Sequence, residues 1–149
     1  MKIPIHKELI FSNQCFDSDI SALKFLSDKL LEKGYVKSSY FDALVKREKV
    51  FPTGLDFIKY GVAIPHADAE YINKSALAIA TLKEPVIFKN MEDKNKEVKI
   101  NFICMIALNE RNHQATFLSD LIGTMSNEEK MNAILNGDEK TIEEIISNI

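Results

Sequence analysis

One short segment, Gly61-Val62-Ala63-Ile64-Pro65-His66, constrains the fold of this chain more than any other. Its apolar residues are typical of a buried strand, and a proline, which has no N–H and a fixed φ, prevents a central strand from continuing. We therefore expect His66 to leave a sheet edge and face a cleft. Because the unperturbed pKa of imidazole lies near neutrality, His66 is either a nucleophile or base at that cleft or a structural histidine hydrogen-bonded at a strand end.

The rest of the chain predicts helices on either side of a group of strands. Apolar alternation or runs predict strands over 62–64, 76–82, 86–88 and 98–107, the last of them central and covered on both faces. Apolar residues at helical spacing predict helices over 17–33, 38–47, 112–125 and 127–135, and a last one through 142–146. Gly34 is the expected C-cap of the first helix, and Pro52-Thr53-Gly54 a turn. This order predicts an α/β fold with a sheet between two helical layers.

Length and composition narrow the class of protein. A chain of 149 residues without repeats or linkers predicts a single domain over residues 1–149. The net charge of −3, with no block of Lys or Arg, gives no reason to expect nucleic acid as a partner. We find no signal-peptide pattern and no apolar run of membrane-spanning length, so we expect no direct membrane insertion. Cys15 and Cys104 form no CxxC motif, which favours a reduced, cytoplasmic protein.

The chain lacks the common cofactor and hydrolase motifs. There is no G-x-G-x-x-G, Walker loop, G-x-S-x-G or H-E-x-x-H pattern. His66, Asp68 and Glu70 alternate as a possible metal trio, but zinc sites usually recruit more nitrogen or sulfur ligands. A Ser/His/Asp triad stays possible, although no serine has the context of a nucleophile elbow. We therefore expect neither a cofactor nor a metal.

A second segment, Arg47-Glu48-Lys49-Val50-Phe51-Pro52-Thr53-Gly54, lies closely upstream of the Pro-His pair. Together the two segments resemble the enzyme IIA (EIIA) components of the bacterial phosphoenolpyruvate-dependent sugar phosphotransferase system (PTS), of the mannitol/fructose type. The resemblance covers nearly the whole chain. The sequence Phe51-Pro52-Thr53-Gly54, together with the acidic Asp68, is most like the galactitol subgroup. It implies a mixed β-sheet sandwiched between α-helices on both faces.

The function that this resemblance implies is a phosphohistidine relay. The phosphocarrier protein HPr would pass a phosphoryl group to Nε2 of His66, and His66 would pass it to a cysteine of an EIIB component. The membrane component EIIC would then carry and phosphorylate galactitol or a related sugar. The alternative is a regulatory EIIA-like module that senses the phosphorylation state of the system without transport.

Three further residues are candidates for the site that the resemblance implies. Arg47 is the best partner for phosphoryl oxygens, because a guanidinium stays charged and binds two oxygens at once; its alternative is an exposed helix arginine paired with an acid. The family has a second histidine at the start of a later helix. That slot falls here on Gln114, which we expect to donate an amide hydrogen bond to phosphate or to the ring of His66. His113 lies about 100° around the helix, and reaches the site only if the helix begins later.

Two expectations concern the surroundings of His66. Phe51, Ile64 and Ala67 are candidates for an apolar docking surface for HPr and EIIB, or else belong to the core. Asp68 would repel an incoming anion unless it is turned away or bonded to backbone. We therefore expect Asp68 to stabilise a turn or to fix the tautomer of His66.

Overall fold

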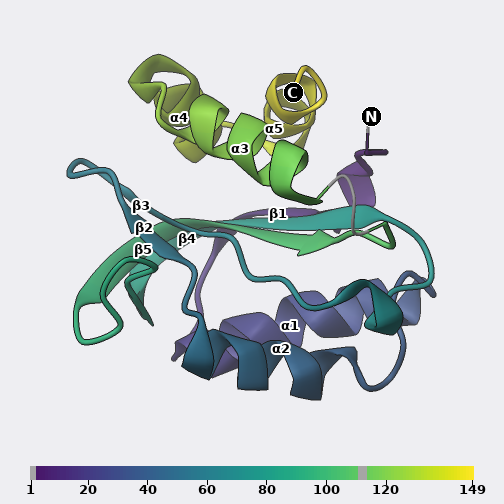
Figure 1. Ribbon diagram of the computed structural model, residues 1–149. Helices are drawn as coiled ribbons and strands as arrows, with labels where there is room; N and C mark the ends of the chain where they lie inside the picture. Colours follow the sequence, from purple (N-terminus) through teal and green to yellow (C-terminus); the bar gives the residue numbers. More distant parts are fainter. Residues whose placement is uncertain (1–2, 111–113) are drawn as a thin grey trace.

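A five-stranded sheet forms the middle layer of the computed structural model, which describes residues 3–110 and 114–149 (Figure 1). Its strands are β1 (Ile10–Gln14), β2 (Gly54–Asp56), β3 (Gly61–Ala63), β4 (Ala76–Lys89) and β5 (Glu97–Ala107), and they lie in the order β1-β4-β5-β3-β2. The pairs β1–β4 and β3–β5 are parallel, whereas β4–β5 and β2–β3 are antiparallel. The sheet is therefore mixed, with β5 in its centre as expected.

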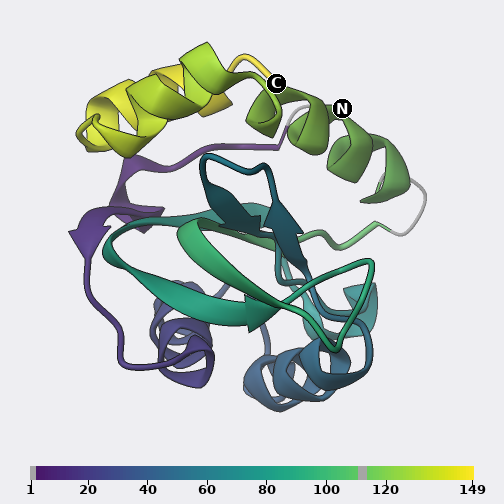
Figure 2. The ribbon, with the colours of Figure 1, turned by 90° about the vertical axis from the view of Figure 1, so that its left-hand side faces the viewer.

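Helices cover both faces of this sheet (Figure 2). On one face lie α1 (Asp19–Glu32) and α2 (Tyr40–Val50), and on the other lie α3 (Gln114–Met125), α4 (Glu128–Leu135) and α5 (Glu139–Ile146). Two short 3-10 turns, η1 (Lys7–Leu9) and η2 (Ala69–Tyr71), complete the described elements. Each face of the sheet packs its own apolar cluster against these helices. The predicted α/β fold, a mixed sheet between two helical layers, is confirmed.

Local capping chemistry sets the helix ends. Ser18 and Ser21 form a reciprocal capping box at the start of α1, and Asn127 caps α4 by accepting from the N–H of Lys130. After α1, Gly34 takes a φ of +78°, and the N–H groups of Gly34 and Tyr35 donate back to the carbonyls of Leu31 and Leu30. The serine cap expected for α2 is wrong in one respect, because Ser39 precedes the helix but makes no side-chain cap bond.

The strand predictions were less accurate. The segments 76–82 and 86–88 are one continuous strand, β4, whose pairing with β5 is interrupted by a bulge between Thr81 and Val86. Strand β1 was missed, and the segment expected to be a turn ends in strand β2, which begins at Gly54. No helix within the described ranges is long and apolar enough to cross a membrane.

Candidate functional site

Strand β3 brings His66 beside β5, and a glycine makes this possible. A Cβ on Gly61 would lie 2.0 Å from the carbonyl oxygen of Lys99, so only glycine lets β3 approach β5 this closely. Beyond β3 the chain still follows β5, because the N–H of Ile106 donates to the carbonyl of Pro65 at 2.9 Å. Strand β3 thus ends before Pro65 as expected, but His66 does not leave the sheet, because it forms an isolated bridge with Ile106 of β5. His66 is 8% exposed, and it lines a pocket of about 620 Å³.

A backbone carbonyl fixes the tautomer of His66. The Nδ1 atom of the ring lies 2.8 Å from the carbonyl oxygen of Ile64. A carbonyl oxygen only accepts, so Nδ1 carries the proton and, in the neutral ring, Nε2 keeps its lone pair. The expectation that Asp68 controls the tautomer is wrong, since the backbone two residues before the histidine does so.

The surroundings of His66 favour its neutral form. Burial is the largest effect and lowers the pKa of His66 below its usual value, and the positive charge of Arg47 lowers it further. The hydrogen bond to Ile64 and the charge of Asp68 act the other way, but the net direction is downward. At neutral pH His66 is therefore an uncharged imidazole with a lone pair on Nε2, which is the form that a nucleophile needs.

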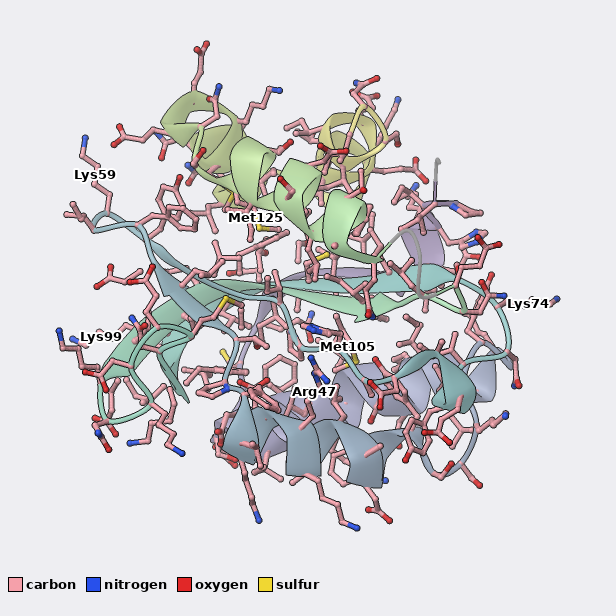
Figure 3. All side chains as sticks on the ribbon, in the orientation of Figure 1. Arg47, Lys59, Lys74, Lys99, Met105 and Met125 are labelled. Atoms are coloured by element: carbon pink, nitrogen blue, oxygen red, sulfur yellow. The ribbon has the colours of Figure 1, made fainter. Side chains whose placement is uncertain are left out.

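Arg47 lies at the same pocket, in the last turn of α2, between that helix and the sheet (Figure 3). Its Nη1 atom is 3.5 Å from Oδ1 of Asp68, and its Cζ atom is 5.5 Å from the centre of the Phe51 ring. Among the described residues, no group accepts a hydrogen bond from the buried Nε atom of Arg47. The guanidinium thus keeps donor capacity for an anion beside His66.

The carboxyl group of Glu48 is a feature of the site that sequence reasoning missed. Glu48 is 9% exposed, and both the N–H and the hydroxyl of Thr53 donate to it, at 2.8 and 2.9 Å. Burial raises the pKa of Glu48 from 4.5 to about 7, although the two bonds from Thr53 oppose the shift. Glu48 and Thr53 both belong to the second segment, in its Arg-Glu and Thr-Gly pairs. The sequence does not show, however, that the side chains of Glu48 and Thr53 meet.

The rim of the pocket is partly apolar. Phe51 is 62% exposed, and Val50 and Met91 are also exposed apolar residues that line the pocket. Ile64 and Ala67 are buried, so of the three docking candidates only Phe51 lies on the surface. The exposed apolar surface beside His66 therefore comes from the end of α2 and from the loop that follows β4.

The second-histidine slot is only partly described. Gln114 is the first residue of α3 and is half-buried, and Leu118, one helical turn later, lines the pocket. The described contacts of the His66 ring do not include Gln114, and the expected donation of Gln114 to phosphate or to the ring stays a prediction. His113 lies outside the described residues.

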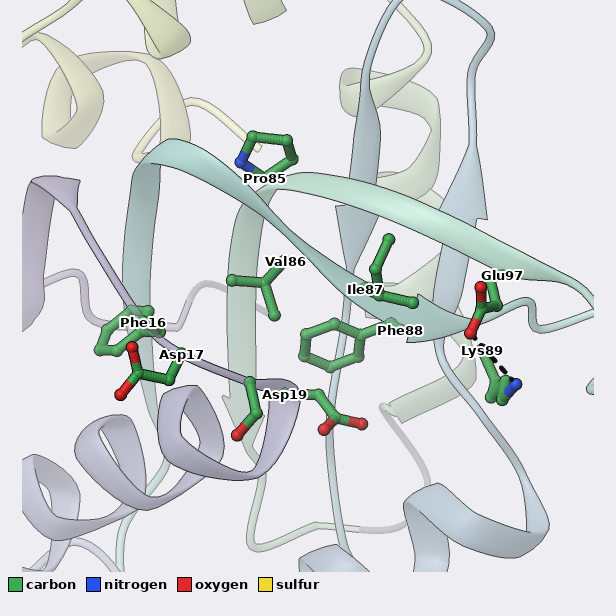
Figure 4. Close-up of a pocket in the computed structure, with 10 residues that line it drawn as sticks. Phe16, Asp17, Asp19, Pro85, Val86, Ile87, Phe88, Lys89 and Glu97 are labelled. Atoms are coloured by element: carbon green, nitrogen blue, oxygen red, sulfur yellow. Dashed lines mark ion pairs between the residues drawn. The ribbon is translucent and has the colours of Figure 1, made fainter.

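Another pocket, of about 390 Å³, lies between the start of α1 and strand β4 (Figure 4). Its acidic side chains are Asp17, Asp19 and Glu97, and Glu97 pairs with Lys89 at 3.6 Å. It contains neither a histidine nor a cysteine. Within residues 3–110 and 114–149, no group of three or more His, Cys, Asp or Glu side chains is placed to hold a metal ion.

A family comparison matches residues 4–149 to "Phosphoenolpyruvate-dependent sugar phosphotransferase system, EIIA 2". The chain belongs to this EIIA family. Members of the family are phosphotransferases that work through a phosphohistidine intermediate. The resemblance inferred from the two segments is thereby confirmed.

Curated relatives of this EIIA chain include both a regulator and a transport component. Transcriptional regulator ManR of Bacillus subtilis (strain 168) is 37% identical over 108 residues, which are 72% of this chain but 15% of that protein. The chain thus spans only a small part of this relative. The PTS system galactitol-specific EIIA component of Escherichia coli (strain K12) is 28% identical over 103 residues, 69% of this chain and 68% of that one. This modest identity supports the likeness to the galactitol subgroup.

The fold also matches a solved EIIA structure. The complex of enzyme IIAMTL and phosphorylated enzyme IIBMTL from Escherichia coli gives a TM-score of 0.80 at 22% identity, covering 98% of this chain and 99% of that one. At this identity the likeness establishes the fold alone. The shared fold is the mixed sheet with helices on both faces described above.

Proposed function

We propose that this chain is a phosphoryl-transfer component of a sugar phosphotransferase system and that Nε2 of His66 is its phosphorylated atom. The observation that carries the proposal is the bond from Nδ1 of His66 to the carbonyl of Ile64, at 2.8 Å. This bond leaves the lone pair on Nε2, in a ring that burial keeps neutral and that lines a pocket shared with Arg47. In-line phosphoryl transfer needs such positioning and charge stabilisation more than covalent machinery.

In the first step of this proposal, Nε2 attacks the phosphorus of phospho-HPr. An N–P bond to His66 forms as the bond to the donor breaks, and the electron pair of the broken bond returns to the donor atom. In the second step, a cysteine thiolate of EIIB attacks the same phosphorus. The S–P bond forms, and the electron pair of the N–P bond returns to Nε2. The chain would act in the cytoplasm, where HPr and the cytoplasmic face of EIIC are found.

Arg47 stabilises the phosphoryl oxygens in this scheme. Its Nε has no acceptor among the described residues, and its Nη1 is held only by an exposed carboxylate. A guanidinium that already lies at the same pocket as the ring can bind the phosphoryl oxygens as their charge develops. Gln114, and His113 if the helix presents it, are the candidates for an additional donor from α3. The exposed Phe51 and its apolar neighbours provide a surface for transient docking of HPr and EIIB.

A regulatory role is the second candidate, because ManR is 37% identical to this chain over 108 residues. In that case His66 would be phosphorylated, and the phosphoryl group would report the state of the system instead of passing to EIIB. The uptake of galactitol or a related polyol is the transport alternative, supported by the 28% identity to the galactitol-specific component.

The test is to incubate the protein with phosphoenolpyruvate, enzyme I and HPr, and to map the acid-labile phosphate by mass spectrometry. We expect one site, His66, which is lost in His66→Gln and kept in the control His6→Gln, which replaces a histidine of the N-terminal segment. A label on His113 or on a cysteine would overturn the assignment. Addition of a galactitol-type EIIB then separates the two candidates, since a transport component loses its phosphoryl group to the EIIB cysteine and a sensing module retains it.

A further inference from the structure

The carboxylate of Asp68 is the one negative side chain paired with Arg47 among the described residues. It follows His66 by two residues, and its Oδ1 lies 3.5 Å from Nη1 of Arg47. Through space, Asp68 raises the pKa of His66 and Arg47 lowers it, so both charges act on the imidazole. The family function proposed above gives Arg47 a role but leaves Asp68 without one.

The ion pair between Arg47 and Asp68 is weak enough for a phosphoryl group to replace the carboxylate. The side chains of Arg47 and Asp68 are 35% and 55% exposed, and an ion pair open to solvent is weak. A phosphoryl dianion on Nε2 of His66 carries more charge and more acceptor oxygens than a carboxylate, and it binds a guanidinium in a bidentate way. The phosphoryl group and Asp68 therefore compete for the same cation.

We propose that Asp68 is a resident counter-ion that Arg47 exchanges for the phosphoryl group, and that this exchange keeps phospho-His66 a ready donor. The inference rests on the proposed function of His66. In the unphosphorylated protein, Asp68 holds Arg47 at the pocket. In the phosphorylated protein, Arg47 turns to the phosphoryl oxygens and Asp68 is left unpaired beside two negative charges.

Asp68 disfavours phosphorylation of His66 in two ways. The pair with Arg47 stabilises the unphosphorylated state, and repulsion destabilises the phosphorylated one. Asp68 thus shifts the exchange equilibrium with phospho-HPr toward free His66 and raises the tendency of phospho-His66 to pass its group on. The transfer itself is the one described above: the N–P bond forms at His66 as the donor bond breaks, and Asp68 takes no proton or electron pair.

The test measures the equilibrium ratio of phosphorylated to unphosphorylated protein in a mixture with a known ratio of phospho-HPr to HPr. We expect Asp68→Asn to raise this ratio roughly threefold to tenfold. The effect should be smaller at high ionic strength, because salt screens both the ion pair of Asp68 with Arg47 and its repulsion of the phosphoryl group. Glu70→Gln is the matched control, since it removes the same charge from an exposed position on the same segment. It should stay close to the wild-type value.

Two further measurements distinguish a counter-ion from a structural residue. Titration of His66 by NMR should show a lower pKa in Asp68→Asn than in the wild type, because the carboxylate no longer favours the charged ring. In an Arg47→Gln background, Asp68→Asn should shift the equilibrium less, because Asp68 and the phosphoryl group no longer compete for a guanidinium.

An equilibrium for Asp68→Asn equal to that of Glu70→Gln, or a shift toward the unphosphorylated form, would overturn the inference. So would an undiminished shift in the Arg47→Gln background. A wild-type protein that acquires no phosphate on His66 would instead refute the proposed function, so the two failures are distinguishable.

Discussion

The buried carboxyl group of Glu48 makes the stability of this fold depend on pH. Burial raises its pKa from 4.5 to about 7, against the two hydrogen bonds from Thr53. The folded protein therefore binds this proton more tightly than the unfolded chain does. The stabilisation is fully present below pH 4.5 and is lost as the pH rises through about 7. The pKa difference corresponds to about 3 kcal/mol of unfolding free energy.

Glu48→Gln removes this titration and keeps a polar group that can both accept from and donate to Thr53. We expect the variant to gain roughly 2 to 3 kcal/mol relative to the wild type between pH 5 and pH 8, measured by urea unfolding at each pH, because a part of the loss in the wild type has already occurred at pH 5. His66 acts in the opposite direction, because its pKa is lowered and its stabilisation is lost as the pH falls. That contribution is common to both proteins and cancels in the difference.

Glu144→Gln is the control for this experiment. Glu144 is exposed on α5, so its replacement should leave the pH dependence unchanged. If the stability difference between wild type and Glu48→Gln stays constant within about 1 kcal/mol from pH 5 to pH 8, burial does not govern this carboxyl group and the reasoning is refuted.

Three other predictions concern the site and the fold. Arg47→Ala should slow phosphorylation by phospho-HPr more than Gln114→Ala does, in quench-flow assays; equal or reversed effects would show that α3 supplies the main donor. Gly61→Ala should destabilise the protein by roughly 3 kcal/mol or more in urea unfolding, because the new Cβ would lie 2.0 Å from the carbonyl of Lys99; a wild-type midpoint would contradict this. Asn127→Ala should cost about 1 kcal/mol through loss of the α4 cap, and Asn127→Asp, which restores an acceptor, should recover it.

The helices were predictable because their signals are local. The capping box at Ser18, the positive φ at Gly34 and the cap at Asn127 are each decided within a few residues of the chain. Strands β1 and β2 carry no such signal. Strand β2 has three residues and exists because it pairs with β3, and β1 pairs in parallel with β4 across more than sixty residues of sequence. The segments 76–82 and 86–88 are predicted as two strands, but Pro85 between them lies within β4, where a bulge accommodates it.

In the site, too, the residues with a local sequence signal were predictable and their partners in the fold were not. His66 and Arg47 were named from residue type and motif, and the structure places both at one pocket. Their partners were not predictable, because a backbone carbonyl has no sequence signature. The carbonyl of Ile64 holds the ring. Asp68, expected to stabilise a turn or to fix the tautomer, makes no side-chain cap bond to η2 and pairs with Arg47.

The spacing of the two motifs has a physical explanation in a chain of hydrogen bonds. Thr53 donates to the carboxyl group of Glu48, the N–H of Ile64 donates to the carbonyl of Thr53 at 3.3 Å, and Nδ1 of His66 donates to the carbonyl of Ile64. The residue next to Arg47 is thereby tied to the imidazole through Thr53, just before β2, and Ile64, just after β3. We therefore expect a change at Glu48 or Thr53 to move the guanidinium and the ring relative to each other, although neither residue needs to touch the phosphoryl group. The two motifs therefore act as one positioning unit, which is why the Arg-Glu pair, the Thr-Gly pair and the Pro-His pair occur together.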